Sequence, residues 1–119
     1  MLMKKKYTIF HNPRCSKSRE ALEILHNKNI SFDIVLYLKK KFSKKDLKEL
    51  LQKLDLSIRD ILRKGEDDYK NNKLNNKKLT NDQLINYVIK FPKLLERPIF
   101  LTEEKGLIAR PPERILELL

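Results

Sequence analysis

Apolar and polar positions follow two different periods in the first third of the chain, and together they predict strands and a helix. Residues 7–10 and 32–37 are rich in β-branched and aromatic side chains, which favours two short strands. Residues 16–27 between them carry apolar side chains at the spacing of an amphipathic helix. Two strands joined by a helix of this length predict a parallel β-α-β unit.

The middle of the chain, about residues 43–95, is predicted to be helical. Ser43 with Asp46, and Thr80 with Gln83, have the spacing of capping boxes, in which two polar side chains bind the free N–H groups at a helix start. Leucine, isoleucine and valine follow each pair at helical period. Two amphipathic helices are therefore expected in this block.

Weaker signals lie between these two helices. A short helical piece is expected over 57–63, with Gly65 ending it and the acidic run 66–68 opening a further helical turn. Residues 70–78 are nearly all asparagine and lysine, which predicts a surface loop.

The last part of the chain predicts an antiparallel hairpin followed by a helix. Strands are expected at 99–102 and 107–110, joined by a four-residue connection that ends in Gly106. A final helix is expected over 112–119, with proline in its first turn. The face expected to be buried consists of Ile115, Leu116 and Leu119.

The predicted order of elements is β-α-β, a helical block, and β-β-α. Apart from the helical block, this is the thioredoxin-type arrangement. We therefore expect an α/β fold in a single domain, residues 1–119, with a helical insertion at about 43–95 between the two halves.

Charge and cysteine content narrow the function classes. The net charge of +11 comes mostly from lysines spread along the whole chain, so we interpret it as a compositional bias and consider nucleic-acid binding unlikely. The single cysteine excludes an internal disulfide and a multi-cysteine metal site. It favours a reducing cytoplasm, as does the lack of an apolar signal segment after the basic residues 1–6. No stretch approaches the roughly 18 apolar residues that span a membrane.

Cys15 is the most informative single residue, because it falls between the first predicted strand and the first predicted helix. Free N–H groups at a helix start and nearby cations both favour thiolate over thiol. A drop of roughly two units from a pKa near 8.5 would leave most of the thiol ionised at pH 7. The alternative is a buried small apolar residue, which its polar flanks disfavour. The nearby cationic candidates are His11, Arg14, Lys17 and Arg19.

Arginine at a few positions is the second chemical signal, since the chain otherwise prefers lysine. Arg63, Arg97 and Arg110 each have a planar fork that can bind a tetrahedral oxyanion at two points. Arg97 precedes Pro98 at the start of a predicted strand, where a cis X-Pro bond is common. In a thioredoxin-type fold, this turn faces the junction between the first strand and the first helix. The alternative interpretation, for any one of these arginines taken alone, is an exposed ion-pair partner. Three forks at one thiolate would form a site that reduces an oxyanion.

Four motifs, in family order and spacing, make the chain similar to the glutaredoxin-dependent arsenate reductase family. They are His11-Asn12-Pro13-Arg14-Cys15-Ser16-Lys17-Ser18-Arg19, Leu62-Arg63-Lys64, Glu96-Arg97-Pro98-Ile99 and Ala109-Arg110-Pro111. The match covers essentially the entire chain.

The resemblance implies a thioredoxin-like fold with a helical insertion and assigns a role to each site residue. Cys15 would attack arsenate, and the oxyanion would be held by three arginines, Arg63, Arg97 and Arg110. His11 and Ser18 would help to activate the thiol, with Asn12 and Arg19 as further supporting residues.

The resemblance also implies the partners of the reaction. Arsenate would be the substrate, glutathione the co-substrate and glutaredoxin the protein partner, with arsenite released and no metal or tightly bound cofactor. A cytoplasmic monomer is expected. The chain ends at Leu119, whereas some arsenate reductases continue further, which leaves open a branch of the family that reduces another thiol or oxyanion substrate.

A different class of function is a transcriptional regulator of the same fold that binds RNA polymerase. Regulators that sense redox state commonly use a Cys-x-x-Cys switch. Ser18 stands at the second position of that spacing, so no internal disulfide can form. The sequence therefore favours the enzyme.

Overall fold

The computed structural model describes residues 6–119, which form two compact units. The first unit comprises the chain up to Lys40 together with Arg97–Leu119, and the second comprises Lys41–Glu96. The basic start, residues 1–6, lies outside the described residues except for Lys6. Within residues 6–119, no helix is both long enough and apolar enough to cross a bilayer.

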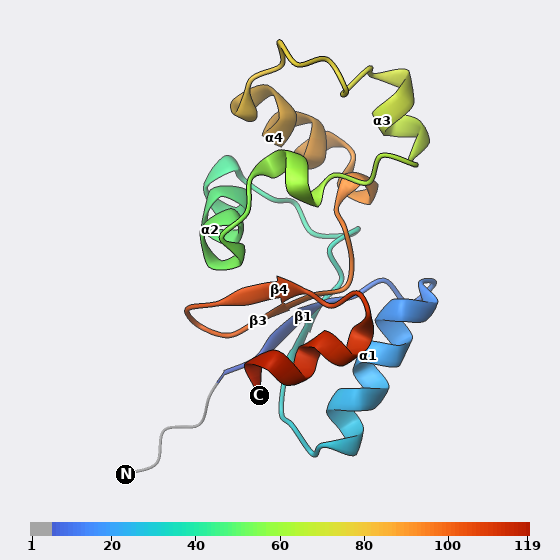
Figure 1. Ribbon diagram of the computed structural model, residues 1–119, viewed down its shortest axis with the longest axis vertical. Helices are drawn as coiled ribbons and strands as arrows, with labels where there is room; N and C mark the ends of the chain where they lie inside the picture. The colour runs from blue at the N-terminus through green and yellow to red at the C-terminus, as the bar shows by residue number, and fades with distance from the viewer. Residues whose placement is uncertain (1–5) are drawn as a thin grey trace. The chain divides into compact units, whose positions relative to one another are not determined.

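The first unit is built on a four-stranded sheet with the order β2-β1-β3-β4 (Figure 1). The strands are β1 (Thr8–Phe10), β2 (Asp33–Val35), β3 (Ile99–Leu101) and β4 (Gly106–Ile108). β1 pairs in parallel with β2 and antiparallel with β3, and β3 pairs antiparallel with β4. The predicted β-α-β unit and hairpin are confirmed. β2 is shorter than expected because it is an edge strand paired only with the three residues of β1.

The hairpin begins at Ile99 as predicted, but its second strand starts one residue earlier than predicted. The N–H of Thr102 donates to the carbonyl oxygen of Lys105 at 2.8 Å and closes the turn. Gly106 is thereby placed in β4, opposite Leu101, and not in the connection. The sequence prediction was wrong here because it interpreted the glycine as a turn residue, whereas the ladder begins at it.

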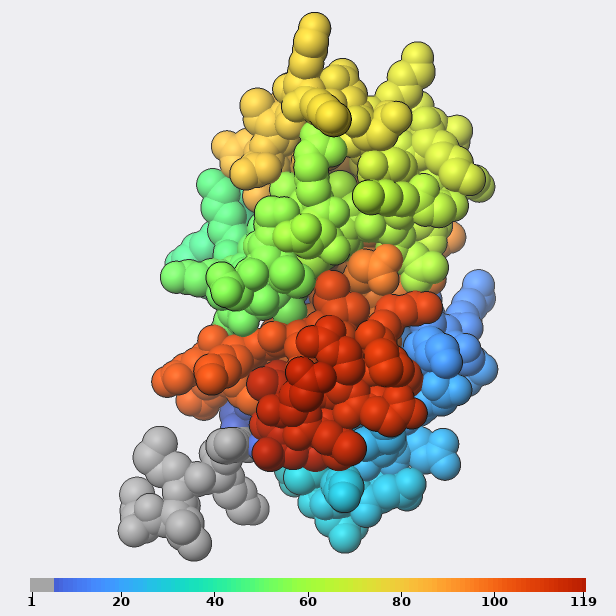
Figure 2. All heavy atoms as spheres, viewed as in Figure 1, coloured from blue at the N-terminus to red at the C-terminus, as the bar shows by residue number. Residues whose placement is uncertain are grey.

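Helix α1 (Ser16–Asn27) has the bounds that the sequence predicts, and it packs beside the C-terminal η3 (Pro112–Leu118) (Figure 1). In Figure 2, residues of η3, in red, lie at the surface beside the blue residues of α1. The core between these elements and the sheet includes Ile9, Leu25 and Phe100, each without exposed surface.

The last helix differs from the prediction, because it is a 3-10 helix and not an α-helix. A 3-10 helix repeats every three residues, so Pro112, Ile115 and Leu118 share a face. Pro112 and Ile115 are buried. Leu116 and Leu119, expected in the core, are 48% and 38% exposed.

The named elements of the second unit are all helices, and an isolated antiparallel bridge joins Leu62 to Leu95. The helices are α2 (Lys44–Leu54), η1 (Ile58–Ile61), α3 (Asp67–Asn71), α4 (Asn81–Lys90) and η2 (Pro92–Leu94). Both predicted capping boxes are confirmed at the starts of α2 and α4, and a third opens η1.

The asparagine- and lysine-rich segment is more ordered than a plain surface loop. Its first residues belong to α3, and Leu74 is fully buried. Arg59 donates from Nη1 to the carbonyl oxygen of Leu74 at 3.0 Å and from Nη2 to that of Asn76 at 2.8 Å. One side chain of η1 therefore fixes the path of this segment.

Candidate active site

The loop between β1 and α1 turns the chain so that Cys15 begins the helix. The N–H of His11 donates to the carbonyl oxygen of Val35 at 2.9 Å and extends the parallel pairing beyond β1. Asn12 closes the turn twice: its Oδ1 accepts from the N–H of Arg14 at 3.0 Å, and its carbonyl oxygen accepts from the N–H of Cys15 at 3.0 Å. Asparagine suits this position because its side chain accepts from the backbone two residues on.

Cys15 is a partly exposed free thiol at the N-cap position of α1. Burial is the largest influence on its pKa and raises it, but hydrogen bonds to the sulfur outweigh burial and lower the pKa below its ordinary value. These bonds come from the N–H of Ser18, the side chain of Arg97, the hydroxyl of Ser18 and the N–H of Lys17. The predicted direction is confirmed.

The source of that shift agrees with the sequence expectation only in part. We expected both helix N–H groups and nearby cations such as Arg14 to lower the pKa, and the main contributions come from helix N–H groups, Ser18 and Arg97. Arg97 is distant in sequence and reaches Cys15 only because β3 pairs with β1. The contribution of the Lys17 and Ser18 N–H groups follows from the helix start that the sequence does predict.

Ser18 and His11 are both buried. Ser18 has no exposed surface, and its Oγ accepts from the N–H of Asn12 at 3.4 Å, so one hydroxyl links the loop to the thiol. Burial, and then the charge of Arg19, lower the pKa of His11. The imidazole is therefore neutral near pH 7 and contributes no positive charge. Its Nδ1 is buried and has no hydrogen-bond partner among the described residues.

Arg97 and Arg110 both lie in the first unit. Each precedes a proline in a cis peptide bond, Pro98 and Pro111 respectively. Nη1 of Arg110 donates to the carbonyl oxygen of Arg97 at 3.2 Å. The side chain of Arg97 in turn binds Cys15, so hydrogen bonds link Arg110 to Arg97 and Arg97 to Cys15. The second cis bond was not predicted, although the Arg-Pro pair was its signal.

Arg63 belongs to the second unit, directly after η1. Its N–H donates to the carbonyl oxygen of Leu94 at 2.7 Å, and its Nε lies 3.4 Å from Oε1 of Glu66. Its Nη1 is buried without a hydrogen-bond partner among residues 6–119. A buried donor of this kind suits an anionic ligand.

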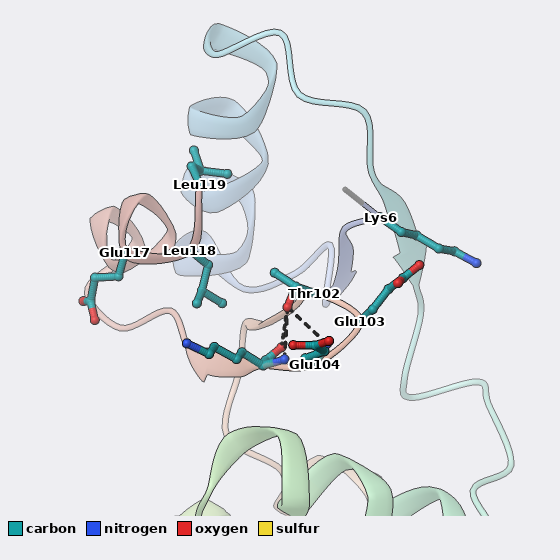
Figure 3. A pocket seen from close by; sticks show the side chains of 8 residues that line it. Lys6, Thr102, Glu103, Glu104, Glu117, Leu118 and Leu119 are labelled. Carbon is teal, nitrogen blue, oxygen red and sulfur yellow. Dashed lines mark hydrogen bonds between the residues drawn. The ribbon is translucent and has the colours of Figure 1, made fainter. Parts of the chain in front are cut away.

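A pocket of about 420 Å³ opens elsewhere in the first unit, at the hairpin turn and the C-terminus (Figure 3). Figure 3 shows Thr102 in it, whose hydroxyl accepts from the N–H groups of Glu104 and Lys105. None of the predicted site residues lines this pocket. In the part of the chain that the structure describes, no three His, Cys, Asp or Glu side chains form a group that could hold a metal ion.

Comparison with known proteins identifies the family. The chain is 42% identical over 117 residues to the uncharacterized protein YfgD of Escherichia coli K12, covering 98% of each. It is 41% identical over 112 residues to an arsenate reductase of Haemophilus influenzae, covering 93% of this chain and 97% of that one. Its structure matches an arsenate reductase from Vibrio cholerae with a TM-score of 0.94 and 39% identity, over 98% of this chain and 100% of that one.

These matches confirm the fold and the resemblance seen in the sequence. The structural match makes the fold thioredoxin-like. The model of the ArsC family matches residues 10–118, which is nearly the whole chain. The chain therefore belongs to the ArsC family.

Proposed function

We propose that the protein reduces arsenate to arsenite, with Cys15 as the nucleophile and glutathione and glutaredoxin as the source of electrons. The observation that carries this proposal is the sulfur of Cys15, whose pKa is lowered and which Arg97 hydrogen-bonds. A thiolate beside a guanidinium can attack an anion that the same guanidinium holds. Relatives named arsenate reductase support the choice of substrate.

The first step joins sulfur to arsenic. The Cys15 thiolate attacks arsenate, an S–As bond forms, and one As–O bond breaks so that its oxygen leaves as water after protonation. The family resemblance supports Arg63, Arg97 and Arg110 as the residues that hold the oxyanion. Holding the anion beside the sulfur offsets the repulsion between two negative groups.

The second step needs an external thiol. Glutathione attacks the sulfur of Cys15, an S–S bond forms, and the electron pair of the S–As bond goes to arsenic, which leaves as arsenite. Glutaredoxin and a second glutathione then reduce the mixed disulfide and regenerate Cys15. Overall, arsenate and two thiols give arsenite, one disulfide and water. Ser18 cannot replace the external thiol, because a hydroxyl forms no disulfide.

The compartment and assembly state belong to the same proposal. A free thiol that must return to its reduced form after each turnover suits a reducing compartment, so we place the reaction in the cytoplasm. We propose that the protein acts as a monomer.

A coupled assay tests the proposal. Glutathione, glutaredoxin, glutathione reductase and NADPH are supplied, and NADPH oxidation is followed with and without arsenate. We expect oxidation that depends on arsenate and is lost in Cys15→Ser. In a single-turnover experiment, the reduced protein with arsenate alone releases no arsenite. No dependence on arsenate, or stoichiometric arsenite from the protein by itself, would contradict the mechanism.

A further inference from the structure

The loop in front of Cys15 is tied to the helix behind it by one side chain. Pro13 and Arg14 are exposed at the tip of this loop, and Pro13 has no N–H to donate. The carbonyl oxygen of Pro13 accepts a hydrogen bond from Nη1 of Arg19 at 3.1 Å. The loop tip and the second turn of α1 are thereby joined.

Arg19 binds the backbone of Cys15 and of the segment before it. Its own N–H donates to the carbonyl oxygen of Cys15 at 3.1 Å, in the ordinary helical pattern. Its guanidinium holds the carbonyl group two residues earlier, at Pro13. A single residue therefore restrains Cys15 itself and the segment that leads into it.

The charge of Arg19 does not act mainly on the thiol. The main groups that lower the pKa of Cys15 are backbone N–H groups, Ser18 and Arg97. The charge of Arg19 acts on His11, where it adds to burial. We therefore expect any influence of Arg19 on the sulfur to work through the position of the backbone.

We propose that Arg19 is a positioning residue: by holding the Pro13 carbonyl group, it keeps the sulfur of Cys15 facing the N–H groups of Lys17 and Ser18. Those N–H groups favour the thiolate only while the sulfur faces them, because hydrogen bonds weaken steeply with distance and angle. Release of the loop tip would let Cys15 turn away from the helix start. The role of Arg19 in turnover rests on the proposed function, whereas its effect on the thiol does not.

The test compares two arginines that carry the same charge near Cys15. Arg19→Ala removes the charge and the bond to Pro13. Arg14→Ala removes an equal charge next to Cys15 but leaves that bond, and the bond from the Arg14 N–H to Asn12 remains because it is a backbone bond. The rate of alkylation by iodoacetamide is measured from pH 5 to pH 10 for each full-length variant.

We expect Arg19→Ala to slow alkylation at pH 6.5 by roughly threefold to tenfold and to move the pH inflection upward, as the loss of hydrogen bonds to a thiolate requires. Arg14→Ala should change the rate by less than about twofold, as expected for an exposed charge. Hydrogen exchange of the Lys17 and Ser18 amides should quicken in Arg19→Ala only.

Two results would overturn the proposal. Equal slowing in both alanine variants would assign the effect to charge. An unchanged inflection in Arg19→Ala would remove the role altogether. Alkylation needs no arsenate, so a protein that shows the expected alkylation pattern and reduces no arsenate would contradict the proposed function and leave the role of Arg19 in place.

Discussion

The two units position the residues of the candidate site by different means. In the first unit, Cys15 and Arg97 come from loops at the ends of paired strands, and long-range pairing of β1 with β3 brings them together. In the second unit, most of the structure follows from local signals such as capping boxes. Arg63 is the exception there, because its N–H is bound to the carbonyl oxygen of Leu94. In both units, backbone pairing between distant segments fixes an arginine, but only Arg97 is bound to the thiol.

The largest expected effect concerns the two cores. Leu25 in the first unit and Leu47 in the second are fully buried, so replacing either with alanine removes a similar packed volume. Leu25→Ala and Leu47→Ala should each lower the free energy of unfolding by about 2–5 kcal/mol. Urea denaturation measures both. A loss below about 1 kcal/mol in one of them would show that this core is loosely packed.

The next effect separates the arginines of the two units. Arg97→Lys and Arg63→Lys keep the charge and lose the fork, so each should lower kcat/KM for arsenate at least tenfold, about 1.4 kcal/mol. Only Arg97→Lys should also raise the pKa of Cys15, because only Arg97 is bound to the sulfur. The coupled assay measures the first quantity, and the pH profile of iodoacetamide alkylation measures the second.

Arg59→Lys serves as a control for stability, because Arg59 binds carbonyl groups of the second unit. If loss of activity in Arg63→Lys came from a disturbed second unit, Arg59→Lys should lose activity as well. Full activity in Arg63→Lys would remove Arg63 from the site. A shift of the thiol pKa in Arg63→Lys would contradict the contrast between the two arginines.

A smaller effect is expected at Ser18, whose hydroxyl links the loop to the thiol. Ser18→Ala should raise the pKa of Cys15 and cost about 1 kcal/mol of stability. The folded pKa of Cys15 lies below the unfolded value, so ionisation stabilises the folded state above the unfolded pKa near 8.5, and this contribution is lost as pH falls through the folded pKa. The stability difference between wild type and Ser18→Ala should therefore be larger at pH 9 than in acid, as urea denaturation at both pH values can measure. A difference independent of pH would mean that the hydroxyl does not act on the thiol.

The smallest effect belongs to the local signals of the second unit. Thr80→Ala breaks the capping box of α4, in which the threonine Oγ1 accepts from the N–H of Gln83 at 3.2 Å. The box is exposed, so the expected loss is about 0.5–1 kcal/mol. Thermal unfolding should show a small fall in Tm, with the alkylation profile of Cys15 unchanged. A changed profile would show that the thiol depends on this helix.

Local patterns were sufficient to predict the elements that short-range forces determine. The bounds of α1 and the capping boxes at Ser43 and Thr80 follow from residues within one or two helical turns. The 3-10 form of η3 and the start of β4 at Gly106 did not follow, because packing and ladder register decide them. Apolar residues at 115, 116 and 119 are consistent with one face of an α-helix. This spacing could not reveal the three-residue period of the 3-10 helix.

The candidate site shows the same division. Cys15 and its lowered pKa could be predicted from a helix start, and Arg97 from an unusual Arg-Pro pair. The bond between them could not be, since it depends on the pairing of β1 with β3. The neutral state of His11 was also missed, because the sequence gives no sign of its burial.

The place of Cys15 at the start of α1 means that the proposed nucleophile is also part of the scaffold. The N–H groups of Lys17 and Ser18 in the first turn of the helix interact with its sulfur and favour the thiolate. A covalent bond to that sulfur cancels its negative charge and weakens what these N–H groups gain from it. Each catalytic cycle would then loosen and restore the first turn of the helix. The NMR signals of the backbone amides in that turn would report, without an attached probe, whether the sulfur is free or bound.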